Sequence, residues 1–230
     1  MIEVKRLQID LGGEPLVDIA FRIRGALAMV GMSGSGKSLT LKAMINMLPK
    51  SMNKVMEMKC DFDPVRGEGI AVIPQNPFTS LNPMAKIRKQ FYVSEEEAAA
   101  LMERVGLEKD HLDRFPAELS GGQLQRAVIA MALSHNPKLL MLDEPTTALD
   151  SESKKNILSL LSDLKKTEGF YMLFVSHDIA SVEAVCDEVV ILKDGRVVES
   201  GLLADVVADP KDPYTKELIA SNFKQREWRS

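Results

Sequence analysis

Residues 31–38, with the sequence GMSGSGKS, constrain the fold more than any other part of this 230-residue chain. They match the pattern GxxxxGK[ST], in which glycines let consecutive backbone amides turn toward phosphate oxygens. The apolar run Ala26–Val30 before the loop predicts a buried strand, and the apolar spacing from Lys37 to Leu48 predicts a helix. A strand, a glycine-rich loop and a helix in this order predict an α/β fold that binds phosphate groups. The residues expected to contact the phosphates are Gly31, Ser33, Gly34, Ser35, Gly36, Lys37, Ser38 and Leu39.

Short apolar runs alternate with helical patterns along the rest of the chain, which is typical of a largely parallel sheet. Asp194-Gly195 predicts a tight antiparallel hairpin, and Ser94 with Glu97 predicts a capping box at a helix start. The region from about 76 to 134 is mostly helical, so we expect a helical lobe inserted in a single domain, 1–230. The remaining strand candidates are Ile70–Ile73, Leu139–Leu142, Met172–Val175 and Val189–Leu192.

Composition narrows the classes of partner. Charged residues make up 27% of the chain and hydrophobic residues 45%, with a net charge of −4. A mildly acidic chain argues against non-specific binding to nucleic acid, and no apolar run approaches the roughly 18–20 residues that a membrane span needs. Cys60 and Cys186 stand far apart in the sequence and are expected to be buried thiols.

Two acidic residues follow the apolar run Leu139–Leu142. In proteins with this phosphate-binding loop, an apolar strand that ends in aspartate brings a carboxylate to magnesium, and Asp143 has that position. Glu144 is the next residue and is placed to act as a general base toward an attacking water. Together with the Ser38 hydroxyl, these residues predict a site for a magnesium nucleotide.

The segment Leu119-Ser120-Gly121-Gly122-Gln123 begins a predicted helix, whose first backbone amides favour an anion. With the loop and Asp143-Glu144, this segment closely resembles the signature of the nucleotide-binding subunit of ATP-binding cassette (ABC) transporters, over almost the whole chain. The resemblance implies a P-loop NTPase with a mixed, largely parallel sheet core, N-terminal antiparallel strands and an inserted helical lobe. It also implies ATP and Mg²⁺ as ligands, and a head-to-tail pair in which Ser120, Gly121, Gly122 and Gln123 of one subunit face the ATP of the other.

The resemblance assigns further roles. Gln75 resembles the residue that contacts magnesium or water and responds to the membrane partner, and His177 resembles the histidine that contacts the γ-phosphate. Ala148-Leu149-Asp150 resembles the loop that links the two subunits. His111 and His135 lack such a context and are expected at the surface. The implied catalytic residues are Glu144, His177 and Gln75, and the implied metal ligands are Ser38, Gln75 and Asp143.

One position departs from the family pattern. An aromatic residue usually stacks on adenine some twenty positions before the loop, and Leu11 occupies the corresponding place here. Adenine would then be held by apolar contact without aromatic stacking, which contributes about 0.5–1.5 kcal/mol for aromatic pairs.

Two segments resemble the oligopeptide, dipeptide and nickel importer branch of the family. They are residues 78–83, FTSLNP, and residues 212–218, DPYTKEL. Short intervals between the motifs, and a chain that ends soon after the second segment, favour nickel or another chelated metal slightly over peptides. The implied partners are a second ABC ATP-binding subunit, identical or related, transmembrane permease subunits and, indirectly, an extracytoplasmic solute-binding protein. The expected location is the cytoplasmic face of the inner membrane, as a peripheral subunit.

Other functions remain as alternatives. A non-catalytic or non-transport nucleotide-binding regulator of the same superfamily is the main one, because of Leu11. A DNA-associated ATPase would need a longer coiled-coil insertion or basic patches, and a small-molecule kinase would lack the segment 119–123 and His177.

Overall fold

The computed structural model describes residues 1–227, with side chains described through Asn222, and residues 228–230 of the predicted domain lie outside them. The chain divides into two compact units, which are described separately below. The first contains Met1–Pro64 and the chain from Tyr171 onward, and the second contains Val65–Phe170. The second unit therefore includes the segment 76–134, predicted as a helical lobe, together with two strands and a long helix.

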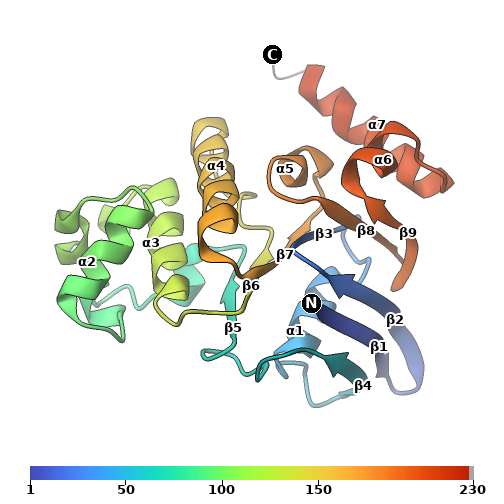
Figure 1. Cartoon of the computed structure of the whole chain (residues 1–230), viewed down its shortest axis with the longest axis horizontal. Coiled ribbons are helices and arrows are strands. Elements are labelled where there is room, and N and C mark those ends of the chain that lie inside the picture. The colour runs from blue at the N-terminus through green and yellow to red at the C-terminus, as the bar shows by residue number, and fades with distance from the viewer. Residues whose placement is uncertain (228–230) are drawn as a thin grey trace. The chain divides into compact units, whose positions relative to one another are not determined.

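Two sheets form the first unit (Figure 1). The antiparallel sheet has the order β2-β1-β4, and its tight β1–β2 turn consists of Gly12 and Gly13, both with positive φ. The predicted N-terminal antiparallel strands are thus confirmed. The strands are β1 (Ile2–Leu11), β2 (Glu14–Ile23) and β4 (Met52–Lys59).

The other sheet of this unit has β3 at its centre, parallel to β7 on one side and to β8 on the other. All five residues of β3 are buried, as its apolar sequence predicts. Strand β9 pairs antiparallel with β8 through the predicted turn at Asp194-Gly195. The elements are β3 (Ala26–Val30), β7 (Tyr171–Ser176), β8 (Glu188–Lys193), β9 (Arg196–Leu202), α1 (Lys37–Met44), α5 (Ile179–Glu183), α6 (Leu203–Ala208) and α7 (Pro213–Glu227).

Helix α1 ends four residues earlier than the sequence predicts, at Met44 instead of Leu48. Asn46 adopts a left-handed conformation, with φ 56°. The Lys54 ammonium on β4 donates to Ala43 O at 3.0 Å and also to Asn46 Oδ1. A cation at the carboxyl end of a helix satisfies its last carbonyl groups. This contact joins residues eleven positions apart in the sequence, so the apolar spacing of the helix does not predict it.

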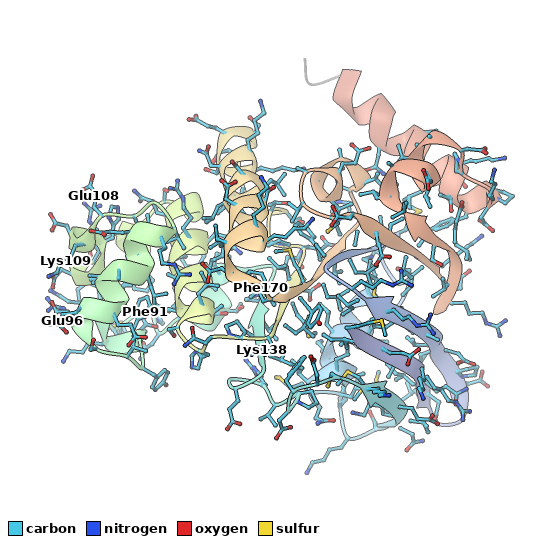
Figure 2. All side chains as sticks on the ribbon, in the orientation of Figure 1. Phe91, Glu96, Glu108, Lys109, Lys138 and Phe170 are labelled. Atoms are coloured by element: carbon cyan, nitrogen blue, oxygen red, sulfur yellow. The ribbon has the colours of Figure 1, made fainter. Side chains whose placement is uncertain are left out.

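The second unit contains a parallel pair of strands, β5 and β6, with helices α2, α3 and α4. Ser94 Oγ accepts the Glu97 amide at 3.2 Å, which confirms the Ser94 half of the predicted capping box of α2. In Figure 2 the side chains of Glu96, Glu108 and Lys109 project from the α2 region and are exposed, whereas Phe91 is buried. The elements are β5 (Ile70–Ile73), β6 (Leu139–Asp143), α2 (Glu95–Arg104), α3 (Gly121–Leu133) and α4 (Ser151–Glu168), with short 3₁₀ turns at Pro77–Ser80, Ile87–Gln90, Lys109–Asp113 and Pro116–Glu118.

Candidate nucleotide-binding site

The loop between β3 and α1 contains two glycines, Gly31 and Gly36, at which a side chain would collide with a neighbouring strand. A Cβ atom at Gly31 would lie 2.3 Å from Leu192 O on β8. Gly36 has φ 101°, and a Cβ atom there would lie 2.8 Å from Val17 Cγ2 on β2. Gly34 also has a positive φ, of 83°. Residues with side chains disfavour positive φ, so the conformation of Gly34 and Gly36 favours glycine at both positions.

Lys37 begins α1 and is held inside the loop. Its side chain is 5% exposed, and Nζ donates to Gly31 O at 2.6 Å and to Met32 O at 2.9 Å. The N-cap of α1 is Gly36, which has no side chain that could cap the helix, and the first turn of α1 contains no acidic residue. The positive end of the helix and the ammonium therefore act together on an anion at this loop, which suits a polyphosphate. Ser33, Gly34 and Ser38 of the same loop are exposed, and Leu39 is half-buried.

His177 lies at the same edge of the sheet as the loop. Strands β3 and β7 are parallel, with Val30 opposite Ser176, so the residues that follow both strands leave the sheet on one side. His177 is exposed, and the turn beneath it is fixed by Asp178, whose amide donates to Ser176 Oγ at 2.9 Å. The Asp178 carboxylate then caps α5 by accepting the Ala180 amide at 3.0 Å. The structure thus brings the predicted phosphate loop and the predicted γ-phosphate contact to one sheet edge.

In the second unit, Gln75 follows β5 and Asp143 is the last residue of β6, and these two strands are parallel, with Ile73 opposite Leu142. Gln75 is exposed and Asp143 is half-buried. Glu144 has φ 47°, an uncommon conformation for a residue with a side chain. Its Oε2 accepts from Thr147 Oγ1 at 3.0 Å. The structure therefore places the three predicted side chains Gln75, Asp143 and Glu144 at the carboxyl ends of neighbouring strands.

The segment 119–123 forms the start of α3, with a reciprocal capping box. Ser120 Oγ accepts the Gln123 amide at 3.3 Å, and Gln123 Oε1 accepts the Ser120 amide at 3.0 Å. The amides of Ser120 and Gln123 therefore bond within the capping box. The predicted anion site would use the amides of Gly121 and Gly122 with the Ser120 hydroxyl. Gly122 cannot carry a side chain without shifting α4, because its Cβ would lie 2.8 Å from Ser153 Oγ.

The prediction that His111 lies at the surface is wrong. Its side chain is 7% exposed, and Nδ1 lies 3.1 Å from Glu108 O. Because that carbonyl can only accept, Nδ1 carries the proton and Nε2 accepts from Gln123 Nε2, at 3.1 Å. His111 therefore fixes the orientation of the Gln123 amide, whose oxygen completes the cap of α3. Apart from Leu112, its neighbours Lys109, Asp110 and Asp113 are charged, so no apolar periodicity indicates this burial. The prediction for His135 stands, since that residue is exposed.

Asp150, in the loop before α4, is the N-cap of that helix. Hydrogen bonds from the backbone and hydroxyl of Ser153 lower the pKa of its carboxyl below the ordinary value of 3.8. The carboxylate is therefore ionised at neutral pH, where it complements the positive end of α4.

A protein-family model described as ABC transporter matches residues 17–147, more than half of the chain. The chain belongs to the ABC transporter family.

Individual proteins of this family are similar to the chain beyond residues 17–147. The oligopeptide transport ATP-binding protein OppD of Bacillus subtilis is 38% identical, over 96% of this chain and 71% of its own length. The peptidoglycan transport ATP-binding protein YejF of Agrobacterium fabrum is 39% identical, over 86% of this chain and 41% of its own length. Both names describe ATP-binding transport proteins, and this ABC subunit is a transport ATPase of the same class.

Solved ABC structures share its fold. The structure of cbiO1 from Clostridium perfringens, described as part of the ABC transporter complex cbiONQ, has a TM-score of 0.77 at 27% identity and covers 90% of each chain. The ATP-binding cassette MJ0796, in a dimeric post-hydrolysis state bound to ADP and phosphate, has a TM-score of 0.71 at 26% identity and covers 88% of this chain and 99% of its own. These likenesses confirm the predicted P-loop ABC ATPase fold. Among the described helices of this subunit, none combines the length and apolar character that a membrane crossing requires.

Proposed function

We propose that this ABC subunit hydrolyses ATP to drive the import of peptides through a membrane permease. One observation carries the proposal: a phosphate-binding loop in which Gly31 and Gly36 leave no space for a side chain occurs in a chain 38% identical to an oligopeptide transport ATP-binding protein. Peptides are favoured over nickel or another metal chelate because the relative's name concerns oligopeptide transport. The slight preference for nickel drawn from motif spacing has no comparable support.

ATP would bind with its β- and γ-phosphates at residues 31–39. The backbone amides of Gly34 and Gly36 and the ammonium of Lys37 would face the phosphate oxygens, since the loop presents one buried cation and an uncapped helix start. The hydroxyl, carboxylate and amide oxygens of Ser38, Asp143 and Gln75 are the donors that Mg²⁺ prefers. When bound, this ion would neutralise charge on the phosphates.

Hydrolysis needs a base for the attacking water, and we assign that role to Glu144. As the water oxygen bonds to the γ-phosphorus, Glu144 accepts a proton and the bond to ADP breaks, which gives ADP and phosphate. The carboxylate keeps its conformation through the Thr147 hydroxyl. His177 would donate to the γ-phosphate, and Gln75 would orient the water.

Two copies of the chain, or this chain and a related one, would pair head to tail. In that arrangement Ser120, Gly121, Gly122 and Gln123 of one subunit contact the ATP bound to the other. A site that is complete only in the closed pair gives ATP a higher affinity for that state, which is the condition for moving a conformational equilibrium. Permease subunits would hold the pair at the cytoplasmic face of the membrane, and a solute-binding protein would deliver the peptide.

The test is to purify the subunit with its permease, reconstitute the complex in vesicles, and measure ATP hydrolysis with the solute-binding protein present. We expect binding protein loaded with a peptide mixture to stimulate hydrolysis several-fold. Lys37→Ala in the same complex should abolish both basal and stimulated hydrolysis, because the loop loses its only lysine.

Two results would overturn parts of this proposal. Stimulation by binding protein loaded with a nickel chelate, and none with peptides, would replace the proposed solute. ATP hydrolysis that no loaded binding protein alters would contradict a role in import.

A further inference from the structure

Helix α7 contacts both of the loops in the first unit that are assigned to the γ-phosphate side of ATP. It begins in the segment DPYT, residues 212–215, which belongs to the second of the two segments that resemble the importer branch. The start of α7 is anchored to β9, because Glu199 Oε1 accepts the Lys211 amide at 2.9 Å and Oε2 accepts the Asp212 amide at 3.0 Å. Asp212 Oδ1 in turn accepts the Tyr214 amide at 2.8 Å. The position of Tyr214 is thus fixed by two carboxylates.

The Tyr214 hydroxyl reaches the phosphate-binding loop. It accepts the backbone amide of Met32 at 2.9 Å. That amide belongs to the same peptide unit as Gly31 O, to which Lys37 Nζ donates at 2.6 Å. One peptide plane at the start of the loop is therefore held from both sides, by Lys37 through its oxygen and by Tyr214 through its nitrogen.

Strand β8 supports the aromatic ring of Tyr214. Lys193 Nζ, at the end of β8, lies 5.1 Å from the ring centroid, within the range of a cation–π contact. The preceding residue, Leu192, has the carbonyl oxygen that approaches Gly31 so closely that a Cβ could not fit. The ring, the end of β8 and the first glycine of the loop are therefore packed together.

Further along α7, Asn222 reaches the turn that contains His177. Asn222 Oδ1 accepts the Ile179 amide at 3.2 Å, and Nδ2 donates to Leu218 O at 2.8 Å. Ile179 is the first residue of α5, directly after Asp178 and two positions after His177. Asn222 lies eight positions after Tyr214 in the helix, a rise of about 12 Å. One rigid element thus bonds to a backbone amide in each of the two loops.

We propose that α7 positions the phosphate-binding loop and the His177 turn relative to each other, through Tyr214 and Asn222. Tyr214 holds the Gly31–Met32 peptide plane when Lys37 leaves Gly31 O for a phosphate. Asn222 fixes the backbone from which His177 projects. Both are positioning residues, and the inference rests on the proposed function because it concerns the same site. It predicts that Tyr214 affects nucleotide binding and Asn222 affects turnover.

Tyr214→Phe tests the first half, because it removes one hydroxyl and keeps the ring over Lys193. Loss of one hydrogen bond corresponds to about a 2- to 10-fold change in an equilibrium constant. We expect Kd and KM for MgATP to rise by that factor with little change in kcat. The matched control is Tyr171→Phe, whose hydroxyl contacts the N-terminal amine at the other end of β7 from His177.

Asn222→Ala tests the second half and should lower kcat several-fold with KM nearly unchanged. Asn222→Asp retains an oxygen to accept the Ile179 amide and should recover most of the turnover. If Tyr214→Phe does not fold, as judged by its thermal melt, Glu199→Gln is the second variant, because it loosens the anchor of residues 211–212 without touching the loop. It should give a smaller rise in KM.

The results separate this inference from the proposed function. Wild-type protein that does not bind MgATP would contradict the proposed function itself. Wild-type protein that binds MgATP normally, with Tyr214→Phe and Asn222→Ala both indistinguishable from wild type and from Tyr171→Phe, would overturn the role of α7. An equal loss of kcat in Asn222→Ala and Asn222→Asp would overturn the role of the Asn222–Ile179 bond.

Discussion

At the scale of single residues, the site depends on positions where only glycine fits. Gly31 and Gly36 fall in this class, because Leu192 O and Val17 Cγ2 occupy the space of a Cβ. The motif predicts these glycines, and the structure supplies the atoms that require them. Leu11 is the opposite case: it is the predicted counterpart of the family's adenine-stacking aromatic residue, and it is 44% exposed at the end of β1.

Leu11→Tyr should strengthen ATP binding. A ring at this exposed position can stack on adenine, which contributes about 0.5–1.5 kcal/mol and corresponds to roughly a 2- to 10-fold lower Kd. Isothermal titration with MgATP measures the change, and affinity for inorganic triphosphate, which has no base, should stay the same. Leu202→Tyr, at a position 55% exposed at the end of β9, is the control for added aromatic surface. Equal tightening of ATP and triphosphate would contradict adenine stacking at Leu11.

At the scale of elements, the sequence predicts those helices and strands whose limits are set by local patterns of residues. The buried strand β3 and the turn at Asp194-Gly195 were predicted from apolar runs and turn residues, and both are confirmed. The end of helix α1 was not predicted correctly, because Lys54 on strand β4 caps the helix. The contact of Tyr214 with Met32 is equally non-local, joining residues 182 positions apart. Local sequence contains no signal for such pairs.

The anchor of α7 on β9 should depend on pH. Burial raises the pKa of Glu199, but hydrogen bonds from the Lys211 and Asp212 amides outweigh it and lower the pKa below the ordinary 4.5. A carboxyl whose pKa is lower in the folded state contributes stability that is present above pH 4.5 and is lost as the pH falls through the folded value.

Glu199→Gln removes this ionisable group and tests the linkage. The variant should melt at a lower temperature than wild type at pH 7, and the difference should shrink as the pH falls below about 4.5. Thermal unfolding followed by circular dichroism across pH 3–7 measures it. Lys211→Ala keeps the backbone amide that donates to Glu199 and removes only the smaller attraction of the Lys211 ammonium, so most of the pH dependence should remain. A constant difference in melting temperature across this range would show that Glu199 acts through packing alone.

At the scale of the whole molecule, the motifs are divided between two units. The phosphate-binding loop and His177 belong to the first, and Gln75, Asp143, Glu144 and the segment 119–123 belong to the second. Motif order in the sequence predicts all of these residues, because each one follows or ends a strand or begins a helix, and their roles stay predictions. It does not identify His111, Tyr214 or Asn222, whose contacts depend on tertiary packing.

The most direct measurement of the central claim is single-turnover hydrolysis and molecular mass for Glu144→Gln in the presence of MgATP. We expect the variant to bind ATP as wild type does, to lose nearly all turnover because it lacks the base, and to accumulate as a dimer of about twice the 25.5 kDa chain mass. Wild-type protein under the same conditions should hydrolyse ATP and return to the monomer. Turnover near the wild-type rate in Glu144→Gln, with ATP bound, would contradict the account.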